Sequence, residues 1–382
     1  MIYFDYNATA PVMREAREAW LDVTEKIGGN PSSMHQAGSR AGVALADARE
    51  KLAAFLGCHP LDIVWTSGAT EANNTVLHHF AQTLDARAQV WVSAIEHPCV
   101  VESAQHYFGK RARLIPATRD GVIDLDWFTA ELADARPGLV GIMAANNETG
   151  VIQPWREARA ICHQYKVPFF TDAVQWLGKM PAKGLGDCDY ISGAAHKFGG
   201  PRGVGFLKVP HRSHVTPLLL GGKQEGGRRA GTENVPIIAA MMAALTVREK
   251  QISNSLHLLR GVWRDNFERE LLRTVPGATI VGAGQPRLWN TVSALMPEGD
   301  RKLLWVVKLD KAGFAVSTGS ACTTGKEEPS HVLGAMGFKG AQAVRAVRFS
   351  GGWETTEADW DALVKAVARV HGEMHHGKPA TA

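Results

Sequence analysis

Short apolar, β-branched or aromatic segments alternate with segments of helical period through the first two thirds of the chain. Helical patterns lie between most of the apolar segments, at Glu71–Thr83, Cys99–Phe108, Leu125–Asp134 and Trp155–Tyr165. The segments that predict strands are Asp62–Thr66, Gln89–Ala94, Arg113–Pro116, Leu139–Ala145, Val167–Thr171, Tyr190–Ser192 and Val204–Val209. Strands that alternate with helices predict a mostly parallel α/β sheet covered on both faces.

The last predicted strand follows its predecessor through a glycine-rich connection instead of a helix. A connection of that kind does not require a parallel crossover. We therefore expect Val204–Val209 to run antiparallel, which makes the sheet a mixed one of seven strands.

A smaller domain is expected after the sheet domain. The pattern from Pro236 to Arg273 is helical for most of its length and predicts a long helix that bridges two domains. Shorter elements follow, at Thr279–Val281, Thr291–Leu295, Arg301–Lys311, Ala315–Thr318, Ser330–Met336, Val344–Ser350 and Glu357–His371. We expect a large domain over residues 13–250 and an α+β domain built from residues 1–12 and 251–382.

Composition narrows the class of protein. The chain has 382 residues, of which 45% are hydrophobic and 21% charged, as in ordinary globular proteins. Its net charge of +4 is spread along the sequence, which disfavours nucleic acid as a partner. The longest apolar stretch, Val235–Leu245, is too short for a bilayer, which needs about 20 residues. The sequence starts without the pattern of a signal peptide, so we expect a cytoplasmic protein without a membrane partner.

Five cysteines at positions 58, 99, 162, 188 and 322 form no C-x-x-C pair and no zinc-finger spacing. Their odd number and wide separation predict reduced thiols, and we expect no metal site. Four of them lie in or beside apolar segments, where packing is the ordinary role of a free cysteine. Cys322 differs, because glycines and hydroxyl residues surround it in Ser317–Gly325. A cysteine in a mobile, exposed loop suits a nucleophile.

Two further features could form an anion site and a cation site. Thr66–Asn74 contains the end of a strand, a glycine turn and a helix start, where Ala69, Thr70 and the first free amides could bind an anion. Taken alone, a plain strand-to-helix turn capped by Thr70 explains it better. Asp172 ends the strand Val167–Thr171, at the edge where open sheets bind ligands. It could pair with a protonated ring nitrogen or simply cap the following helix.

Lys197 lies after a predicted strand among small residues, with His196 before it. A lysine that reacts as an amine must lose its proton, and burial beside other cations lowers the pKa of such a lysine. A solvated lysine in a glycine-rich loop is the plainer interpretation. The crowding of small residues around Lys197 favours a flat bound group.

Taken together and in this order, these features resemble the NifS/IscS group of cysteine desulfurases, class-V enzymes of the fold-type-I pyridoxal-phosphate family. The resemblance runs from Tyr3–Thr9 to Arg348–Ser350, so it covers nearly the whole chain. The motifs that carry it are Gly29–His35, Thr66–Asn74, Glu96–Pro98, Asn146–Gly150, Asp172–Gln175, His196-Lys197, Arg229–Asn234, Gly319–Cys322 and Glu328–Leu333.

The resemblance implies pyridoxal 5′-phosphate as the cofactor. Lys197 is expected to bind it covalently and to carry protons, Asp172 to pair with its ring nitrogen, and His97 to stack on the ring. The implied cofactor-binding set is Ala69, Thr70, His97, Asn147, Asp172, Gln175, His196, Lys197 and Thr232. Within that set Asn147 and Gln175 lie near the phenolate oxygen, Thr70 and His196 bind the phosphate, and Thr232 reaches across from the second subunit of a homodimer.

The implied reaction converts L-cysteine to L-alanine. Arg348, with Asn30, is expected to hold the substrate carboxylate, for which a planar guanidinium is well suited. Lys197, His97 and Cys322 are the implied catalytic residues, and Cys322 receives the substrate sulfur as a persulfide. A sulfur-acceptor protein of iron–sulfur cluster assembly, or of another sulfur-using pathway, would then collect it.

Three departures from the family pattern stand out. Ala194 replaces the phosphate-binding serine three residues before the lysine, which removes a bond of about 1.5–3 kcal/mol. Gln224–Gly227 lacks the arginine that the family has in this segment. Ser350–Thr355, which follows the expected substrate-binding Arg348, also differs from the family pattern. The C-terminus does not match the tail that IscS-like members use toward scaffold proteins.

Two other functions are compatible with most of these residues. A related pyridoxal-phosphate enzyme, such as a selenocysteine lyase, β-lyase or aminotransferase, would keep Lys197, Asp172 and His97 but would not need Cys322. A catalytically weak cofactor-binding partner protein is the third hypothesis, suggested by Ala194 and the altered region after Arg348.

Overall fold

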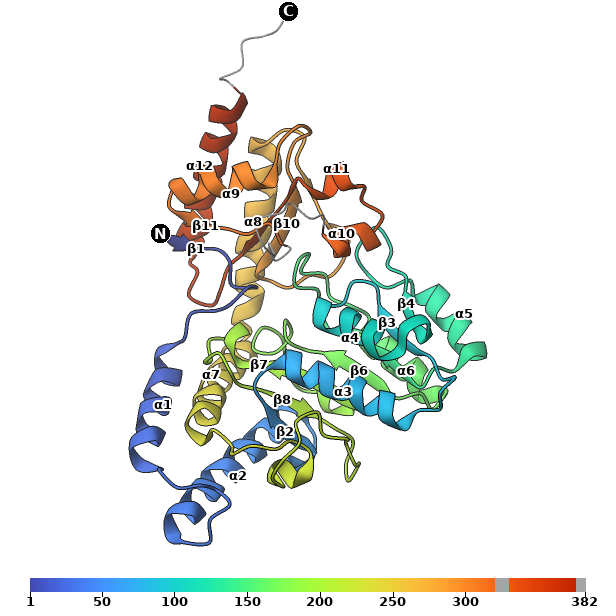
Figure 1. The fold of residues 1–382 in the computed structure, drawn as a ribbon. Coiled ribbons are helices and arrows are strands. Elements are labelled where there is room, and N and C mark those ends of the chain that lie inside the picture. The colour runs from blue at the N-terminus through green and yellow to red at the C-terminus, as the bar shows by residue number, and fades with distance from the viewer. Residues whose placement is uncertain (320–329, 376–382) are drawn as a thin grey trace, which may run out of the picture.

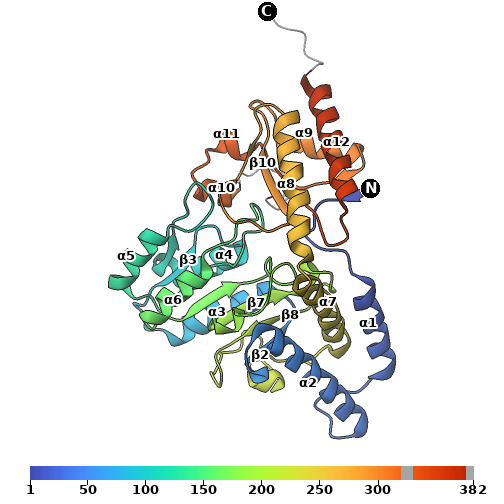
Figure 2. The same ribbon diagram turned by 180° about the vertical axis from the view of Figure 1, so that it is seen from behind.

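The computed structural model describes residues 1–319 and 330–375. A wide sheet with flanking helices forms the lower part of the molecule in Figure 1, and a smaller group of helices and short strands lies above it. Figure 2 shows the same two parts from behind, with α8 running from one toward the other.

The large sheet has seven strands in the order β2-β8-β7-β6-β5-β3-β4. Its strands are β2 (Ile63–Thr66), β3 (Val90–Ser93), β4 (Ala112–Ile115), β5 (Leu139–Gly141), β6 (Phe169–Asp172), β7 (Tyr190–Ala194) and β8 (Gly205–Lys208). β8 pairs antiparallel with both β7 and β2, whereas the pairs among β7, β6, β5, β3 and β4 are parallel. The predicted mixed, mostly parallel sheet is therefore confirmed, including the reversed strand.

Helices cover both faces of this sheet. One face packs against α3 (Ala69–Thr83) and α4 (Pro98–Phe108), and the other packs against α2, α5, α6 and α7. The strand pattern explains the division, because Ile63 and Trp65 of β2 point to one side while Val64 points to the other. The bounds of the remaining helices of this layer are α2 (Gln36–Leu56), α5 (Leu125–Ala135), α6 (Trp155–Gln164) and α7 (Val235–Ser253).

Two helices precede the sheet that the sequence patterns above did not predict, α1 (Arg14–Lys26) and α2. The His35 side chain accepts a hydrogen bond from the amide of Gly38 and so caps the start of α2. Gly57, with φ of 79°, ends it in the left-handed conformation. Both helices pack against α7. Their formation depends on this tertiary contact, which their local sequence does not reveal.

The long helix predicted from Pro236 to Arg273 is two helices, α7 and α8 (Leu256–Thr274). The break falls at Ser255, whose φ of 59° lies in the left-handed region. A left-handed residue cannot continue a right-handed helix, so the prediction of one uninterrupted helix is wrong. Ser253-Asn254-Ser255 are cap and turn residues, but the helical pattern on both sides of them led to the prediction of one helix.

The smaller part of the molecule contains a three-stranded antiparallel sheet and a two-stranded parallel one. Its elements are β1 (Ile2–Tyr3), α8, β9 (Thr279–Ile280), β10 (Thr291–Leu295), α9 (Lys302–Lys311), β11 (Phe314–Ala315), α10 (His331–Ala335), α11 (Gly340–Ala343), β12 (Ala346–Ser350) and α12 (Glu357–His375). β1 pairs with β11, which brings the N-terminus to this part of the chain.

Phe4 is fully buried in the same apolar cluster as residues of α8, β10, β12 and α12. The clusters of the large sheet draw instead on residues from Ala16 to Leu245. On this separation we propose the two domains at the sequence-derived bounds, 13–250 and 1–12 with 251–382.

Single turns of 3-10 helix complete the structure, at Pro60–Asp62, Gly109–Arg111, Leu185–Asp187, Ala195–Lys197 and Gln224–Gly227. The fourth of these follows β7 directly and presents Lys197. Among the described residues there is no helix of the length and apolarity that crossing a membrane requires.

Candidate active site

Lys197 lies where β7 ends, and its amine faces the N-terminal segment. The Nζ atom donates to the carbonyl oxygens of Asn7 and Ala8, each at 2.8 Å. Burial and the charge of Arg348 together lower the pKa of Lys197 to about 8, against the opposing charges of Asp172 and Asp5. About a tenth of this amine is therefore unprotonated at pH 7, far more than for an ordinary lysine, and a nucleophilic lysine reacts in that form.

Asn7 connects this amine to both parts of the molecule. Its side-chain Nδ2 donates to the carbonyl of Asn147 at 3.1 Å and to the Thr291 hydroxyl at 2.9 Å. Its backbone oxygen also accepts from Gln175 Nε2 at 3.0 Å. Asn7 is only 1% exposed, so the segment that carries it is fixed beside Lys197.

Asp172 ends β6, on the strand that neighbours β7. Its Oδ2 accepts from Asn73 Nδ2 at 2.8 Å, and its Oδ1 accepts from the amide of Val174 at 3.0 Å. Asn73 comes from α3, which packs across β7 and β8. The carboxylate is buried and held in one orientation. Its charge acts on the pKa values of both Lys197 and His97.

His97 precedes α4 and caps its start. Its Nδ1 accepts from the amide of Cys99 at 3.2 Å and lies 3.0 Å from the Cys99 sulfur. Because Nδ1 is engaged as an acceptor, the proton of the neutral ring is on Nε2. Burial lowers the pKa of His97, with Lys197 and His331 acting in the same direction and Asp172 opposing them, so the ring is neutral at pH 7.

The predicted anion site lies at the start of α3. Ala69 and Thr70 are its first two residues, so their amides have no acceptor within the helix. His196 belongs to the turn that carries Lys197, and its Nδ1 lies 3.3 Å from the Thr9 hydroxyl. Burial lowers the pKa of His196 to about 4, aided by the charges of Lys197 and Arg202. His196 is therefore a neutral hydrogen-bonding group and not a cation at pH 7.

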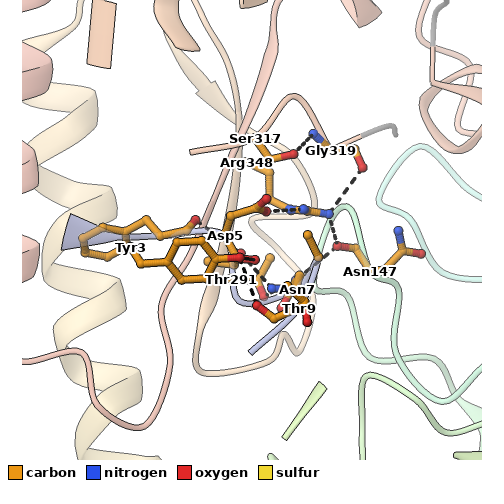
Figure 3. Close-up of polar contacts among 12 residues, drawn as sticks. Tyr3, Asp5, Asn7, Thr9, Asn147, Thr291, Ser317, Gly319 and Arg348 are labelled. Carbon is orange, nitrogen blue, oxygen red and sulfur yellow. Dashed lines mark hydrogen bonds and ion pairs between the residues drawn. The ribbon is translucent and has the colours of Figure 1, made fainter. Parts of the chain in front are cut away.

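Arg348 projects from β12 toward the same segment (Figure 3). One Nη atom contacts Asp5 Oδ1 at 2.6 Å. The other donates to the carbonyl oxygens of Asn147 at 3.0 Å and Gly319 at 3.3 Å. The Arg348 side chain is 4% exposed, and it already binds one carboxylate in this position.

Cys322 lies outside the described residues, but both flanks of its segment are described. Gly319 contacts Arg348, and its amide donates to the Ser317 hydroxyl at 3.2 Å. On the other side Ser330 donates from its hydroxyl to the Glu148 carboxylate at 2.6 Å. The last described residue before Cys322 and the first one after it therefore both make contacts beside this site, with Arg348 and Glu148.

Two of the predicted residues lie apart from this cluster. Asn30 is exposed on the connection between α1 and α2, where its Oδ1 accepts from the amide of Ser32. That connection lies at the opposite end of the molecule from β10 in Figures 1 and 2. Thr232 is exposed on the loop before α7. Within one chain neither residue joins the group around Lys197, so their roles stay predictions.

The class-V aminotransferase family model matches residues 2–363. The chain is 37% identical to a cysteine desulfurase of Gluconacetobacter diazotrophicus over 99% of this chain and 95% of that protein. It is 35% identical to the cysteine desulfurase NifS of Azotobacter vinelandii over 99% and 94% of the two chains. The chain belongs to the NifS/IscS group of cysteine desulfurases.

Solved structures of similar proteins share the fold. A NifS-like protein superposes with a TM-score of 0.87 at 33% identity, over 97% of this chain and 98% of that one. The structure of SspA in complex with cysteine has a TM-score of 0.79 at 28% identity, over 92% and 98%. Cysteine desulfurases are pyridoxal-phosphate enzymes, so the residues above can be compared with what that cofactor needs.

The donor set fits pyridoxal phosphate. An amine with a lowered pKa can take the aldehyde, a fixed carboxylate can pair with the ring nitrogen, and the free amides of a helix start can bind the phosphate. Lys197, Asp172 and the start of α3 supply these groups. The buried Asn73 Oδ1 has no partner among the described residues, as expected of an acceptor beside a binding site.

The departures from the family pattern have structural counterparts. Ala194 is buried and offers no donor, while Ser192 on the same face of β7 is fully buried with an unpartnered hydroxyl in the described structure. Gly226 has a φ of 67°, a conformation that glycine adopts without strain. In the segment after Arg348, Trp353 packs on Trp289 with ring centroids 4.7 Å apart.

Asn7, Asp5, Asn73, Cys99 and Lys179 also belong to the site, although the motifs alone gave none of them a role. Asp5 and Asn7 lie in the N-terminal motif, and Asn73 lies in the motif that starts α3. For Asp5, Asn7 and Asn73, this presence in a family motif was the signal in the sequence that could have assigned them to the site. Their partners are distant in sequence, up to 343 positions away, so spacing could not reveal the contacts.

Proposed function

We propose that this protein is a cysteine desulfurase that uses pyridoxal phosphate to transfer sulfur from L-cysteine to Cys322. The observation that carries the proposal is that Lys197 and Arg348 both contact the segment Asp5–Ala8, while Asp172 lies close enough to act on the charges of Lys197 and His97. Both flanks of the Cys322 segment are bonded nearby, to Arg348 and to Glu148. Membership of the desulfurase group supports the same reaction, and SspA, a structural neighbour, is solved with cysteine bound.

Pyridoxal phosphate, when bound, supplies an electron sink that acidifies the α-proton of an amino acid and weakens its bond to the β-sulfur. Lys197 Nζ would hold the cofactor and then move the substrate proton. Asp172 would pair with the ring nitrogen through the carboxylate that Asn73 and the Val174 amide orient. His97 would lie against the ring, and it carries its proton at Nε2, since its Nδ1 is occupied.

Arg348 binds the substrate carboxylate by exchanging one of its present partners. The Asp5 contact shows that a carboxylate fits against this guanidinium, with an N–O distance of 2.6 Å. A charge-assisted bond of this kind contributes about 1.5–3 kcal/mol. The arginine therefore selects an amino acid over an amine of the same side chain.

The sulfur transfer balances without an external oxidant. The Cβ–S bond of L-cysteine breaks, an S–S bond forms on Cys322, and the substrate carbon gains the proton that makes L-alanine. One sulfur atom moves from one thiol to another, which leaves a persulfide. Cys322 is three residues after Gly319, and three residues of chain span at most about 10 Å. The thiol is thus tethered to the residue that contacts Arg348.

The test is incubation of the purified protein with L-cysteine. We expect equimolar alanine and, with a thiol reductant, sulfide, and without reductant an added mass of one sulfur on the peptide that contains Cys322. Cys322→Ala should bind the cofactor and lose at least 100-fold in alanine formation, an order of magnitude set by loss of the nucleophile. Cys58→Ala is the matched control and should retain activity, because this partly buried thiol lies near Lys208 and Asp62, which have no role in the proposed reaction.

Each rival function has its own outcome in this experiment. Full turnover by Cys322→Ala would indicate a related lyase or aminotransferase instead. A colourless protein that does not take up pyridoxal phosphate would indicate a weak partner protein. The desulfurase proposal predicts neither.

We also propose a homodimer in which Thr232 of each subunit faces the other subunit's site. Leu219 and Leu220 are 41% and 84% exposed, and the Leu219 carbonyl accepts from the amide of Ala230, two residues before Thr232. Exposed apolar residues in this loop suit a surface that a second copy covers. Light scattering after gel filtration should give twice the 41.3 kDa chain mass. A cytoplasmic location and an acceptor in iron–sulfur cluster assembly complete the proposal.

A further inference from the structure

Lys179 is a second buried lysine close to Lys197, and the reaction described above does not use it. It is 3% exposed, and its Nζ donates to two side-chain oxygens, Asn7 Oδ1 at 2.8 Å and Gln175 Oε1. No carboxylate pairs with it in the part of the chain that the structure describes. Burial lowers the pKa of Lys179 well below its usual value, and the charges of Lys197 and Arg348 lower it further.

The two acceptors match an unprotonated amine, which has two N–H bonds. A buried ammonium without a carboxylate would be costly, so the lowered pKa and the bonding pattern agree. Lys179 then acts as a neutral donor of two hydrogen bonds. Its role is geometric, because it contributes no charge in this form.

The turn that carries Lys179 is itself fixed. Gly178 has a φ of 70°, and a Cβ at this position would meet the Cβ of Phe198 at 2.3 Å. The carbonyl of Gly178 accepts from Trp353 Nε1 at 2.7 Å, and that of Lys179 accepts from Trp289 Nε1 at 2.9 Å. Two tryptophans of the smaller domain therefore hold the backbone from which the Lys179 side chain extends.

The two oxygens that Lys179 holds belong to residues around the Lys197 amine. The backbone carbonyl of Asn7 accepts from Lys197 Nζ at 2.8 Å and from Gln175 Nε2 at 3.0 Å. With Oε1 of Gln175 turned toward Lys179, the amide nitrogen of Gln175 must face Asn7. Asn290 Nδ2 donates to the same Asn7 Oδ1 at 3.1 Å, so the Asn7 side chain has one orientation.

We propose that Lys179 is a positioning residue for Lys197, which it serves by fixing Asn7 and Gln175 so that the Asn7 carbonyl receives the Lys197 amine. The inference rests on the proposed function only in taking Lys197 as the cofactor-binding residue. It makes a prediction about the cofactor-free protein, which can be tested whether or not the chain desulfurates cysteine.

A hydrogen bond from an ammonium to a carbonyl stabilises the charged form. Release of Asn7 should therefore lower the pKa of Lys197 below its present value of about 8. If Lys179 acted through a positive charge instead, its removal would raise that pKa. The direction of the shift separates a geometric role from an electrostatic one.

The experiment measures how fast Lys197 reacts with a small acylating reagent in cofactor-free protein at pH 7 and at pH 10. Mass spectrometry of the Lys197 peptide gives both rates. The ratio to compare is the rate at pH 7 divided by the rate at pH 10, because differences in the access of the reagent to Lys197 cancel in it. Lys179→Met removes both donors and should raise the ratio about threefold to fivefold, as a fall of 0.5–1 unit in the pKa of Lys197 requires. Lys179→Gln, which restores a neutral N–H donor, should return the ratio toward that of the unaltered protein.

Lys208→Met is the matched control. Lys208 is also a buried lysine, but it donates to the Cys188 carbonyl at 2.6 Å, away from Asn7. Its loss should leave the Lys197 ratio unchanged. Asn7→Ala, which removes the side chain that Lys179 holds and keeps the backbone carbonyl, should repeat the effect of Lys179→Met and serves if that variant does not fold.

An unchanged ratio in both Lys179→Met and Asn7→Ala overturns the proposal. So does a lower ratio, which would assign Lys179 an electrostatic role. Equal ratios in the Met and Gln variants would contradict it as well, because the two differ in their hydrogen bonds and not in charge. Loss of desulfurase activity with unaltered ratios would concern the proposed function alone.

Discussion

Lys197 illustrates how a single residue acquires chemistry from its surroundings. Its ordinary pKa would keep the amine protonated at pH 7, and burial together with the charge of Arg348 lowers that pKa to about 8. Two backbone carbonyls, those of Asn7 and Ala8, hold the amine in place. The residue type was evident in the sequence, whereas the environment that makes the amine reactive comes from chain segments almost 200 positions away.

The pKa of Lys197 determines how capture of pyridoxal phosphate depends on pH. Only the neutral amine attacks the aldehyde, and the neutral fraction increases as the pH rises through about 8. The rate of reconstitution of cofactor-free protein, followed by absorbance, should therefore rise between pH 7 and pH 9 and level off above. Arg348→Gln should move the midpoint upward, because it removes a neighbouring positive charge.

Arg345→Gln is the control for that shift, since Arg345 donates to the Met296 carbonyl and is absent from the charges that act on Lys197. A midpoint near the usual lysine pKa in the unaltered protein would contradict the buried environment described above.

At the scale of elements, connections decide more than periodicity does. β8 runs antiparallel because a short glycine-rich connection follows β7, and this could be predicted. The break between α7 and α8 was not predicted, although Ser253, Asn254 and Ser255 are residues that favour caps and turns. Ser255 has a φ of 59°, and the long helical pattern on both sides of these three residues outweighed their local signal in the prediction.

Ser255→Gly should stabilise the protein. A non-glycine residue in the left-handed region costs about 1–2 kcal/mol, part of which glycine loses again through its greater freedom in the unfolded chain. We expect a net gain of roughly 0.5–1 kcal/mol and a rise in Tm of about 1–3 °C in scanning calorimetry.

Asn254→Gly provides the comparison, because Asn254 is the exposed neighbour with a φ of −82°, where glycine gains nothing. That variant should leave Tm unchanged or lower it. An equal rise in both variants would argue against relief of strain at Ser255.

At the scale of the whole molecule, the N-terminal segment joins the two domains at the site. Residues 2–4 belong to the smaller domain through β1 and Phe4, while Asn7 reaches Asn147 and Gln175 of the larger one. The segment Ser350–Thr355 closes over it, and a Cβ on Gly352 would lie 2.1 Å from the Tyr6 ring. The departure of Ser350–Thr355 from the family pattern therefore affects how this segment packs against the N-terminal segment.

Gly352→Ala should destabilise the protein. The added methyl group forces the buried Tyr6 ring to move, and overpacking of this kind costs about 1–3 kcal/mol. We expect Tm to fall by roughly 3–8 °C and the cofactor to be held less tightly, because Asn7 follows Tyr6 directly.

Gly334→Ala, in α10, is the matched substitution, since a Cβ there has no neighbour within 4 Å among the described residues. Its Tm should stay within a degree or two of the original, roughly the effect of an exposed helical site. Equal losses in the two variants would mean that contact with Tyr6 is not the cause.

The sequence by itself determined the seven strands, most of the helices, the reversed strand and the residue types of the site. These features depend on local period, on turn residues and on motifs a few residues long. Only the tertiary structure decided that Lys179 holds Asn7 beside the Lys197 amine and that Arg348 contacts Asp5. Such contacts join positions hundreds of residues apart, and their energy depends on burial and orientation, which no short stretch of sequence specifies.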